Sequence, residues 1–305
     1  MSPELNPESR GELVRLLAAR ASPMAPMPTD AEPSLPKLAG VKAVLFDVYG
    51  TLFISGTGDI GLQQEAARGP AMVEALRAAG FTGATDALGR QAVARLMDLI
   101  REVHRERLEV GFAYPEVDIR DVWRDLLREL SEGGQLEPPR DDLQVRRLAI
   151  EYEIRVNPVW PMPGLEEMLV ALRKKGVRLG IVSNAQFYTP LMFEALTGRD
   201  LAGWGFDPDL CIWSFEHRVA KPAASLFEAT LDRLRRQHAV PPAGTLVIGN
   251  DMLNDIAPAA RLGCRTALFA GDRRSWRPRP GDPRCAGIAP DVVLTSLPQI
   301  LSCLE

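Results

Sequence analysis

Residues 44–53 read VLFDVYGTLF, and this stretch decides how the rest of the chain is interpreted. A short apolar run without polar alternation predicts a strand that is covered on both faces. The run ends in Asp47, although a carboxylate is costly to bury, and Gly50 with Thr51 then turns the chain. An acid at the end of a buried strand either caps a following helix or belongs to a functional site.

Similar apolar runs recur along the chain and indicate further strands. The predicted strands are residues 42–48, 177–183, 209–214, 245–249, 265–270 and 291–295. Most of them are separated by segments with helical periodicity, at 164–176, 223–238 and 254–263. Alternating strands and helices predict an α/β fold with a doubly wound parallel sheet.

The region between residues 56 and 160 breaks this alternation. It contains helical stretches and no convincing strand, so we expect an α-helical cap inserted after the first strand. The α/β core then comprises residues 41–55 and 161–305. Residues 1–40 are expected to form a short helix and a linker or loosely attached tail, because the second half of this segment is rich in Pro and small residues.

The composition limits the classes of partner. Of the 305 residues 46% are hydrophobic and 25% charged, as in a globular domain. A net charge of −4 provides no basic field for nucleic acid. No apolar run is long enough to cross a membrane and the N-terminus does not resemble a signal peptide, so we expect a cytoplasmic protein. Scattered cysteines and few histidines favour structural thiols over a zinc site. The oligomeric state is left open.

Polar side chains follow four of the predicted strands at one edge of the sheet. They are Asp47, Ser183 with Asn184, Lys221, and Asn250 with Asp251. The carboxyl ends of parallel strands border a crevice in which ligands bind. Acids, a hydroxyl and an ammonium group gathered there would hold a magnesium ion and an anion such as phosphate. Singly, each acid could instead cap a helix, and the lysine could be an ordinary surface residue.

The segment GTGDIG, residues 56–61, matches the G-x-G-x-x-G fingerprint of dinucleotide sites. The fingerprint belongs in the first strand–helix turn, with an acid-terminated second strand about 20 residues later. Here the chain has already turned at Gly50, and no such strand follows. We therefore interpret residues 56–61 as a glycine flap and expect no nicotinamide cofactor.

Beyond residue 40 most of the chain resembles the haloacid dehalogenase (HAD) superfamily. FDVYGTL at 46–52 is similar to the family's first motif, and IVSN at 181–184 is similar to the second. The pair KP at 221–222 resembles the third, and IGNDMLNDIAPAARLG at 248–263 resembles the fourth. The motifs occur in the family's order, each after a predicted strand. The helical insertion resembles the family's C1-type cap, which closes over the crevice.

The resemblance implies a hydrolase that forms a covalent intermediate on Asp47. Thr51 and Ser183 would donate hydrogen bonds to the transferring group, and Asn184 completes the second motif. Lys221 would neutralise the negative charge that develops on that group.

The resemblance also implies a Mg²⁺ cofactor, held by Asp47, the main-chain carbonyl of Tyr49 and the fourth motif. That motif usually reads GDxxxD or GDxxxxD, whereas here Asn250 follows the glycine. The pair is either Asp251 with Asp255 or Asn250 with Asp255. The first pair is favoured because it retains two acids.

Tyr49 occupies the position of a second aspartate, which serves the family's phosphatases as general acid and base. A phenol is a poor base at neutral pH, and the missing proton transfer is worth about 10²–10⁴ in rate. The family's dehalogenases carry Tyr there, but they also need an arginine soon after the first motif, and none occurs before Arg68. The most basic stretch is GDRRSWRPRPGDPR at 271–284. Because it follows the predicted strand at 265–270, it could reach an anionic substrate, a partner or the cap, but a solvated surface loop is the favoured interpretation.

These observations favour a Mg²⁺-dependent phosphatase that acts on a small phosphorylated metabolite, with its general acid missing or supplied by the cap. A hydrolase of carbon–halogen bonds similar to the 2-haloacid dehalogenases is the first alternative. A catalytically decayed HAD-fold binding protein is the second, because a fold does not determine a substrate.

Overall fold

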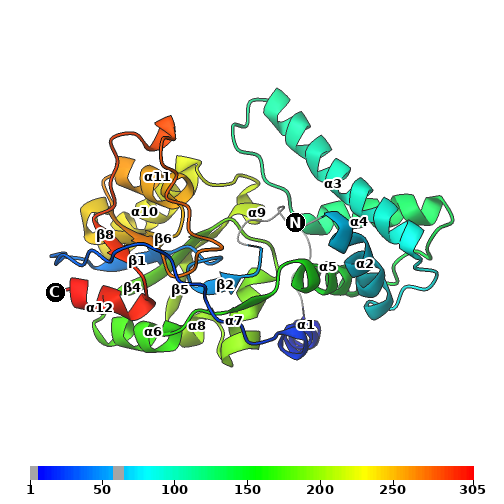
Figure 1. Ribbon diagram of the computed structural model, residues 1–305, viewed down its shortest axis with the longest axis horizontal. Coiled ribbons are helices and arrows are strands. Elements are labelled where there is room, and N and C mark those ends of the chain that lie inside the picture. The colour runs from blue at the N-terminus through cyan, green and yellow to red at the C-terminus, as the bar shows by residue number, and fades with distance from the viewer. Residues whose placement is uncertain (1–5, 58–64) are drawn as a thin grey trace.

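The computed structural model describes residues 6–57 and 65–305 and contains a six-stranded parallel sheet (Figure 1). The strand order is β5-β4-β1-β6-β7-β8, so β1 lies where the chain switches from one half of the sheet to the other. All six strands overlap the predicted apolar runs. They are β1 (Ala43–Phe46), β4 (Arg178–Ser183), β5 (Phe206–Trp213), β6 (Thr245–Gly249), β7 (Arg265–Phe269) and β8 (Val292–Leu294).

The central strand β1 contributes to two apolar cores, because successive residues of a strand point to opposite faces. Val44 belongs to one core and Leu45 to the other. Helix α6 (Leu165–Lys174) contributes side chains to the first core and α10 (Ala224–His238) to the second, and Figure 1 shows them on opposite sides of the sheet. The doubly wound α/β fold predicted from the sequence is confirmed.

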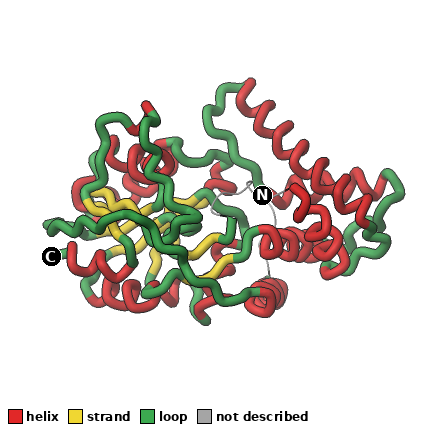
Figure 2. The backbone as a smooth tube through the Cα atoms, viewed as in Figure 1, coloured by secondary structure: helices red, strands yellow, loops and turns green. Residues whose placement is uncertain are grey.

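Four helices of the insertion lie together beside the sheet (Figure 2). They are α2 (Glu65–Ala78), α3 (Asp86–Glu109), α4 (Ile119–Glu132) and α5 (Asp142–Val156). Each of the last three begins at a polar side chain that accepts a hydrogen bond from a backbone N–H of the first turn, which stabilises the helix start. The capping residues are Thr85, Asp118 and Asp141.

A short antiparallel ribbon joins the two ends of the insertion, where β2 (Phe53–Ser55) pairs with β3 (Val159–Pro161). The sequence predicted no strand between residues 56 and 160, and this expectation is wrong for the start of β3. Three residues are too few to produce a recognisable periodicity. The ribbon holds both ends of the insertion close to the turn that follows β1.

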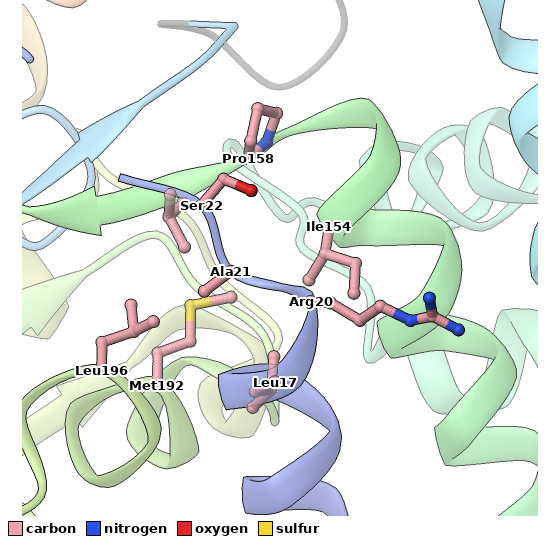
Figure 3. A pocket seen from close by; sticks show the side chains of 9 residues that line it. Leu17, Arg20, Ala21, Ser22, Ile154, Pro158, Met192 and Leu196 are labelled. Carbon is pink, nitrogen blue, oxygen red and sulfur yellow. The ribbon is translucent and has the colours of Figure 1, made fainter. Parts of the chain in front are cut away.

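Helix α1 (Pro7–Arg20) contacts both the insertion and the core. Arg147 of α5 pairs with Glu12 of α1 at 2.7 Å, and Arg10 of α1 forms an ion pair with α7 (Thr189–Thr197). Figure 3 shows a pocket of about 130 Å³ at this junction, with side chains from all three helices around it. Its lining includes Leu17 of α1, Ile154 of α5 and Met192 of α7.

The Pro-rich segment that follows α1 is fixed on the core. Ser34 exchanges two backbone hydrogen bonds of 3.0 Å with Val293 of β8. Thr29 donates its hydroxyl to the carbonyl of Ala270 at 2.7 Å. The expectation of a loosely attached tail is therefore wrong, because backbone pairing with a distant strand leaves no mark in a Pro-rich composition.

Short elements complete the core, and the sequence did not predict most of them. They are α8 (Leu201–Trp204), α9 (Ser214–His217), α11 (Ala257–Arg261) and α12 (Ile300–Cys303). In residues 6–57 and 65–305 no helix is long and apolar enough to cross a membrane. The four cysteines are buried and form no disulfide. The glycine flap expected at 56–61 lies largely outside the described residues.

Candidate active site

The carboxyl ends of the central strands converge on Asp47, which follows β1 and is 6% exposed. Ser183, the last residue of β4, donates its hydroxyl to Asp47 Oδ1 at 3.0 Å. Thr51 Oγ1, on the turn after β1, lies 3.4 Å from Oδ2. Lys221, downstream of β5, donates from Nζ to Oδ1 at 2.7 Å. Two hydroxyls and an ammonium group therefore surround the candidate nucleophile.

Lys221 is a buried cation between two acids. Its Nζ also donates to Asp255 Oδ1 at 2.5 Å, and its side chain is 3% exposed. Burial acts to lower the pKa of Lys221, but Asp255 and Asp47 outweigh burial and raise that pKa above its ordinary value. Burial raises the pKa of Asp255, while the lysine opposes this shift. The ammonium group is therefore charged at neutral pH.

Asn184 fixes the position of this lysine. Its Oδ1 accepts a hydrogen bond from the backbone N–H of Lys221 at 2.7 Å, and its Nδ2 lies 3.4 Å from the carbonyl of the same residue. The side chain of Asn184 thus positions the third motif against the second.

The hydroxyl of Tyr49 is engaged away from Asp47. It lies 2.8 Å from Thr189 Oγ1 and 3.6 Å from Met192 Sδ. Burial raises the pKa of Tyr49 well above its ordinary value, and the charges of Glu153 and Asp47 raise it further. A phenol that stays protonated in this way cannot serve as a general base at neutral pH.

In the fourth motif, Asp251 and the amide of Asn250 have different partners. Arg279 forms a two-pronged ion pair with Asp251, with Nε 3.0 Å from Oδ1 and Nη2 2.6 Å from Oδ2. The amide oxygen of Asn250 instead accepts a hydrogen bond from Thr51 Oγ1 at 3.2 Å. The geometry therefore favours Asn250 with Asp255 as the motif's pair, rather than the combination of Asp251 with Asp255 that the sequence favoured.

Asp255 returns to the strand end through a π-helical turn, Met252–Ile256. Its Oδ2 accepts a hydrogen bond from the backbone N–H of Asp251 at 3.0 Å. A Cβ on Gly249 would lie 2.3 Å from the carboxyl carbon of Asp255, so glycine alone leaves room for this carboxylate. The glycine of the motif is thus required by the close approach of its own acid.

The oxygen atoms near Asp47 limit the metals that could bind. Across the described ranges, no three His, Cys, Asp or Glu side chains form a group that could hold a metal ion. The Asp47 carboxylate and Asn250 Oδ1 lie together, with the Thr51 hydroxyl in contact with both. The family resemblance adds the main-chain carbonyl of Tyr49. Mg²⁺ prefers oxygen ligands and commonly binds one or two carboxylates, substrate phosphate and water. This donor set fits Mg²⁺, with a single carboxylate.

A cleft of about 90 Å³ opens over these groups. Most of the predicted site residues line it, and the remaining two, Thr51 and Ser183, contact Asp47 directly. Three further lining residues were not expected from the sequence. Among the described residues, the cleft is lined by Asp47, Tyr49, Asn184, Lys221, Asn250, Asp251 and Asp255, and in addition by Ser55, Asn254 and Arg277.

The Arg-rich segment 271–284 forms part of this site. Arg277 donates its backbone N–H to the carbonyl of Asn250 and accepts a hydrogen bond from the N–H of Met252, both at 2.9 Å. Ser275 packs on the turn after β1, where a Cβ on Gly50 would lie 2.3 Å from Ser275 Cβ. The expectation of a solvated loop is wrong here. The alternative that the sequence left open, contact with the site from the end of β7, agrees with this geometry.

One carboxyl group of the insertion connects to the wall of the cleft. Ser55 donates its hydroxyl to Asn157 Oδ1 at 2.8 Å, and Asn157 Nδ2 donates to Glu153 Oε1 at 3.2 Å. Burial raises the pKa of Glu153. The side chain of Asn157 lies between Glu153 and Ser55, so the Glu153 carboxyl positions Ser55 through this amide. Glu153 is not among the described residues that line the cleft.

Comparisons with known proteins agree with the motifs. Residues 41–263 match the family of haloacid dehalogenase-like hydrolases. Glyceraldehyde 3-phosphate phosphatase of Pyrococcus furiosus is 27% identical over 207 residues, which cover 62% of this chain and 78% of that protein. The structure of a HAD phosphatase from Thermococcus onnurineus is 22% identical, with a TM-score of 0.48, and the match covers 87% of this chain and 99% of that one.

The L-2-haloacid dehalogenase of Xanthobacter autotrophicus is 20% identical, with a TM-score of 0.45, and the match covers 86% of this chain and 97% of that one. The family match spans well over half of the sequence and includes all four motifs. The chain therefore belongs to the haloacid dehalogenase-like hydrolases.

Proposed function

We propose that this hydrolase is a phosphatase that acts on small phosphorylated metabolites through a covalent intermediate on Asp47. The observation that carries the proposal is the buried Asp47 carboxylate at the cleft, with Ser183 and Lys221 donating to one oxygen and Thr51 beside the other. The relative from Pyrococcus furiosus, whose name is that of a phosphatase, supports the same chemistry.

An oxygen of Asp47 attacks the phosphorus atom. The new bond to phosphorus forms as the bond to the leaving oxygen breaks, and the electron pair leaves with that oxygen. The hydroxyls of Thr51 and Ser183 donate to the transferring group, and Lys221 balances its negative charge. A water molecule then attacks the same phosphorus and gives up a proton to the surrounding solvent. The bond between phosphorus and Asp47 breaks, which releases phosphate and restores the carboxylate.

Magnesium is the proposed cofactor, held by Asp47, the main-chain carbonyl of Tyr49 and the amide oxygen of Asn250. When bound, it supplies positive charge to the oxygens of the phosphoryl group. Asp251 acts on the site indirectly, because Arg279 holds its carboxylate. Asp255 acts through Lys221, the cation that it shares with Asp47.

The leaving group must depart without a strong proton donor from the cleft. Tyr49 donates to or accepts from Thr189, and burial raises its pKa. Of the described acids that line the cleft beside Asp47, Asp251 and Asp255 are both ion-paired. We therefore expect the fastest hydrolysis for phosphate esters whose alcohol is acidic, such as phenols.

Hydrolysis of carbon–halogen bonds is the second candidate, favoured by Tyr49 and by the lack of a three-acid metal cluster among the described residues. Arg68, the first basic residue after the first motif, contacts Met97 Sδ within the insertion at 3.8 Å. It is not among the described residues that line the cleft. The halide or carboxylate partner that this reaction requires is therefore not supplied at the expected position.

The test is a comparison of phosphate release with halide release. Phosphate release from p-nitrophenyl phosphate and a panel of metabolites is measured with and without Mg²⁺, and chloride release from 2-chloropropionate is measured without metal. Asp47→Asn should abolish phosphate release, whereas Asp125→Asn, at a half-exposed position of α4, should preserve it. Wild-type protein that releases chloride and no phosphate would overturn the proposal.

Hydrolysis in H₂¹⁸O separates the two reactions at Asp47 itself. In a phosphatase water attacks phosphorus, so the label enters the released phosphate. In a dehalogenase water attacks the carbonyl carbon of the ester on Asp47, so the label enters this residue. Mass spectrometry of the peptide that contains Asp47 after a single turnover therefore identifies the reaction.

A further inference from the structure

The Arg-rich segment, residues 271–284, contains five arginines in different surroundings. Arg274 and Arg284 pair with aspartates of the same segment, and Arg279 pairs with Asp251. Arg273 is exposed. Arg277 is the one of the five that lines the cleft, and its Nη1 donates a hydrogen bond to the carbonyl of Trp276 at 3.1 Å. The segment thus combines structural arginines with one that faces the site of the reaction.

The backbone holds Arg277 in a defined place. Its N–H and carbonyl are hydrogen-bonded to the strand-end segment that contains Asn250 and Met252, at 2.9 Å each. The preceding turn is fixed by the buried Asp272, whose carbonyl accepts hydrogen bonds from the N–H groups of Ser275 and Trp276 at 3.1 and 2.9 Å. A group placed in this way binds with little loss of backbone freedom.

Arg277 and Lys221 approach the cleft from opposite sides. Lys221 follows β5, whereas the Arg-rich segment follows β7, and β1 with Asp47 lies between these strands in the sheet. The backbone of Arg277 is hydrogen-bonded to Asn250 at the end of β6, the strand next to β1 on the side away from β4 and β5. Since Lys221 contacts Asp47, we assign it to the transferring phosphoryl group, which leaves Arg277 on the other side of Asp47 for a different group of the substrate.

We propose that Arg277 binds a second anionic group of the substrate, so that the enzyme prefers phosphomonoesters that also carry a carboxylate or a second phosphate. This inference rests on the phosphatase function proposed above. A guanidinium group offers a planar fork that binds carboxylate or phosphate through two hydrogen bonds. Among the described residues that line the cleft, Lys221 and Arg277 carry the positive charge, so a second anion has Arg277 as its partner.

The test uses three substrates whose leaving groups are all primary three-carbon alcohols and differ in the substituent at the far carbon. They are 3-hydroxypropyl phosphate, 3-(phosphonooxy)propanoate and propane-1,3-diyl bisphosphate. Wild-type protein should show a kcat/KM at least about tenfold higher for one or both two-anion substrates, mainly through a lower KM. The carboxylate and phosphate arms identify which second anion is preferred. In Arg277→Gln the ratio of two-anion to one-anion kcat/KM should fall to near 1, and Arg277→Lys should retain part of it.

Arg273→Gln is the matched control, because it removes an exposed arginine from the same segment and should leave the ratio unchanged. A wild-type ratio near 1, or equal losses on all three substrates in Arg277→Gln, would overturn the inference. Circular dichroism verifies that each variant is folded.

Binding is measured separately, by calorimetry with 3-phosphonopropanoate and propylphosphonate, which cannot be hydrolysed. Tighter binding of 3-phosphonopropanoate that is lost in Arg277→Gln supports the second anion site even if no phosphate ester is turned over. In that case the proposed phosphatase function fails and the anion site stands. Equal affinity of wild-type protein for the two phosphonates contradicts the anion site.

Discussion

Replacing Lys221 by methionine should strongly destabilise the fold. Its ammonium group lies 2.7 Å from Asp47 Oδ1 and 2.5 Å from Asp255 Oδ1, and all three side chains are at least nine-tenths buried. Methionine has a similar length and no charge, so the substitution leaves two carboxylates buried without a cation. Removing one partner of a buried ion pair typically costs about 3–5 kcal/mol. We expect a loss of free energy of unfolding in this range.

Urea denaturation followed by circular dichroism measures this loss. With a slope of about 3 kcal/mol per molar urea, a loss of 4 kcal/mol lowers the midpoint by about 1.3 M. Lys174→Met, at an exposed position of α6, is the control and should change stability by less than about 0.5 kcal/mol. A loss below about 1 kcal/mol in Lys221→Met would refute the claim that this lysine compensates the buried acids.

A double-mutant cycle identifies the cause of the loss. In Asp255→Asn the amide oxygen can still accept the hydrogen bond that the backbone N–H of Asp251 donates to the carboxylate. The substitution also removes one of the two negative charges. The double variant Lys221→Met with Asp255→Asn should therefore be more stable than Lys221→Met alone, by about 1–3 kcal/mol. Strictly additive losses in the cycle would mean that cavity formation, and not uncompensated charge, dominates.

Three further predictions concern the turn after β1 and the fourth motif. Tyr49→Phe should change kcat for p-nitrophenyl phosphate by less than about threefold, because the Tyr49 hydroxyl is hydrogen-bonded to Thr189. A loss of about 10²-fold would instead identify Tyr49 as an acid–base residue. Asn250→Asp adds a second carboxylate to the proposed magnesium site and should tighten Mg²⁺ binding by about tenfold in calorimetry, whereas unchanged affinity would remove Asn250 from the ligands. Gly50→Ala should lower the thermal midpoint far more than Gly40→Ala. Both glycines have a positive φ, but of the two only a Cβ at residue 50 would meet a side chain, that of Ser275 at 2.3 Å. Similar shifts for the two glycine variants would show that backbone strain, and not contact with the Arg-rich segment, sets the cost.

The sequence by itself determined the sheet and the residues that gather at its edge. Each strand is a short apolar run, and the side chain that follows it must appear at the carboxyl end of a parallel sheet. This local rule suffices to bring Asp47 and Ser183 into contact, because each lies at the end of a neighbouring strand. Lys221 lies beyond α9 and is positioned by Asn184.

Only the tertiary structure decided how the remaining charged groups are used. Arg279 neutralises Asp251, Asn250 joins Thr51, and the hydroxyl of Tyr49 is bonded to Thr189. Each of these contacts joins segments that are distant along the chain and lack a periodic pattern, so no local rule predicts which donor reaches which acceptor. For the same reason the Arg-rich segment looked like a solvated loop in the sequence, although in the fold its backbone pairs with the fourth motif and Arg277 lines the cleft.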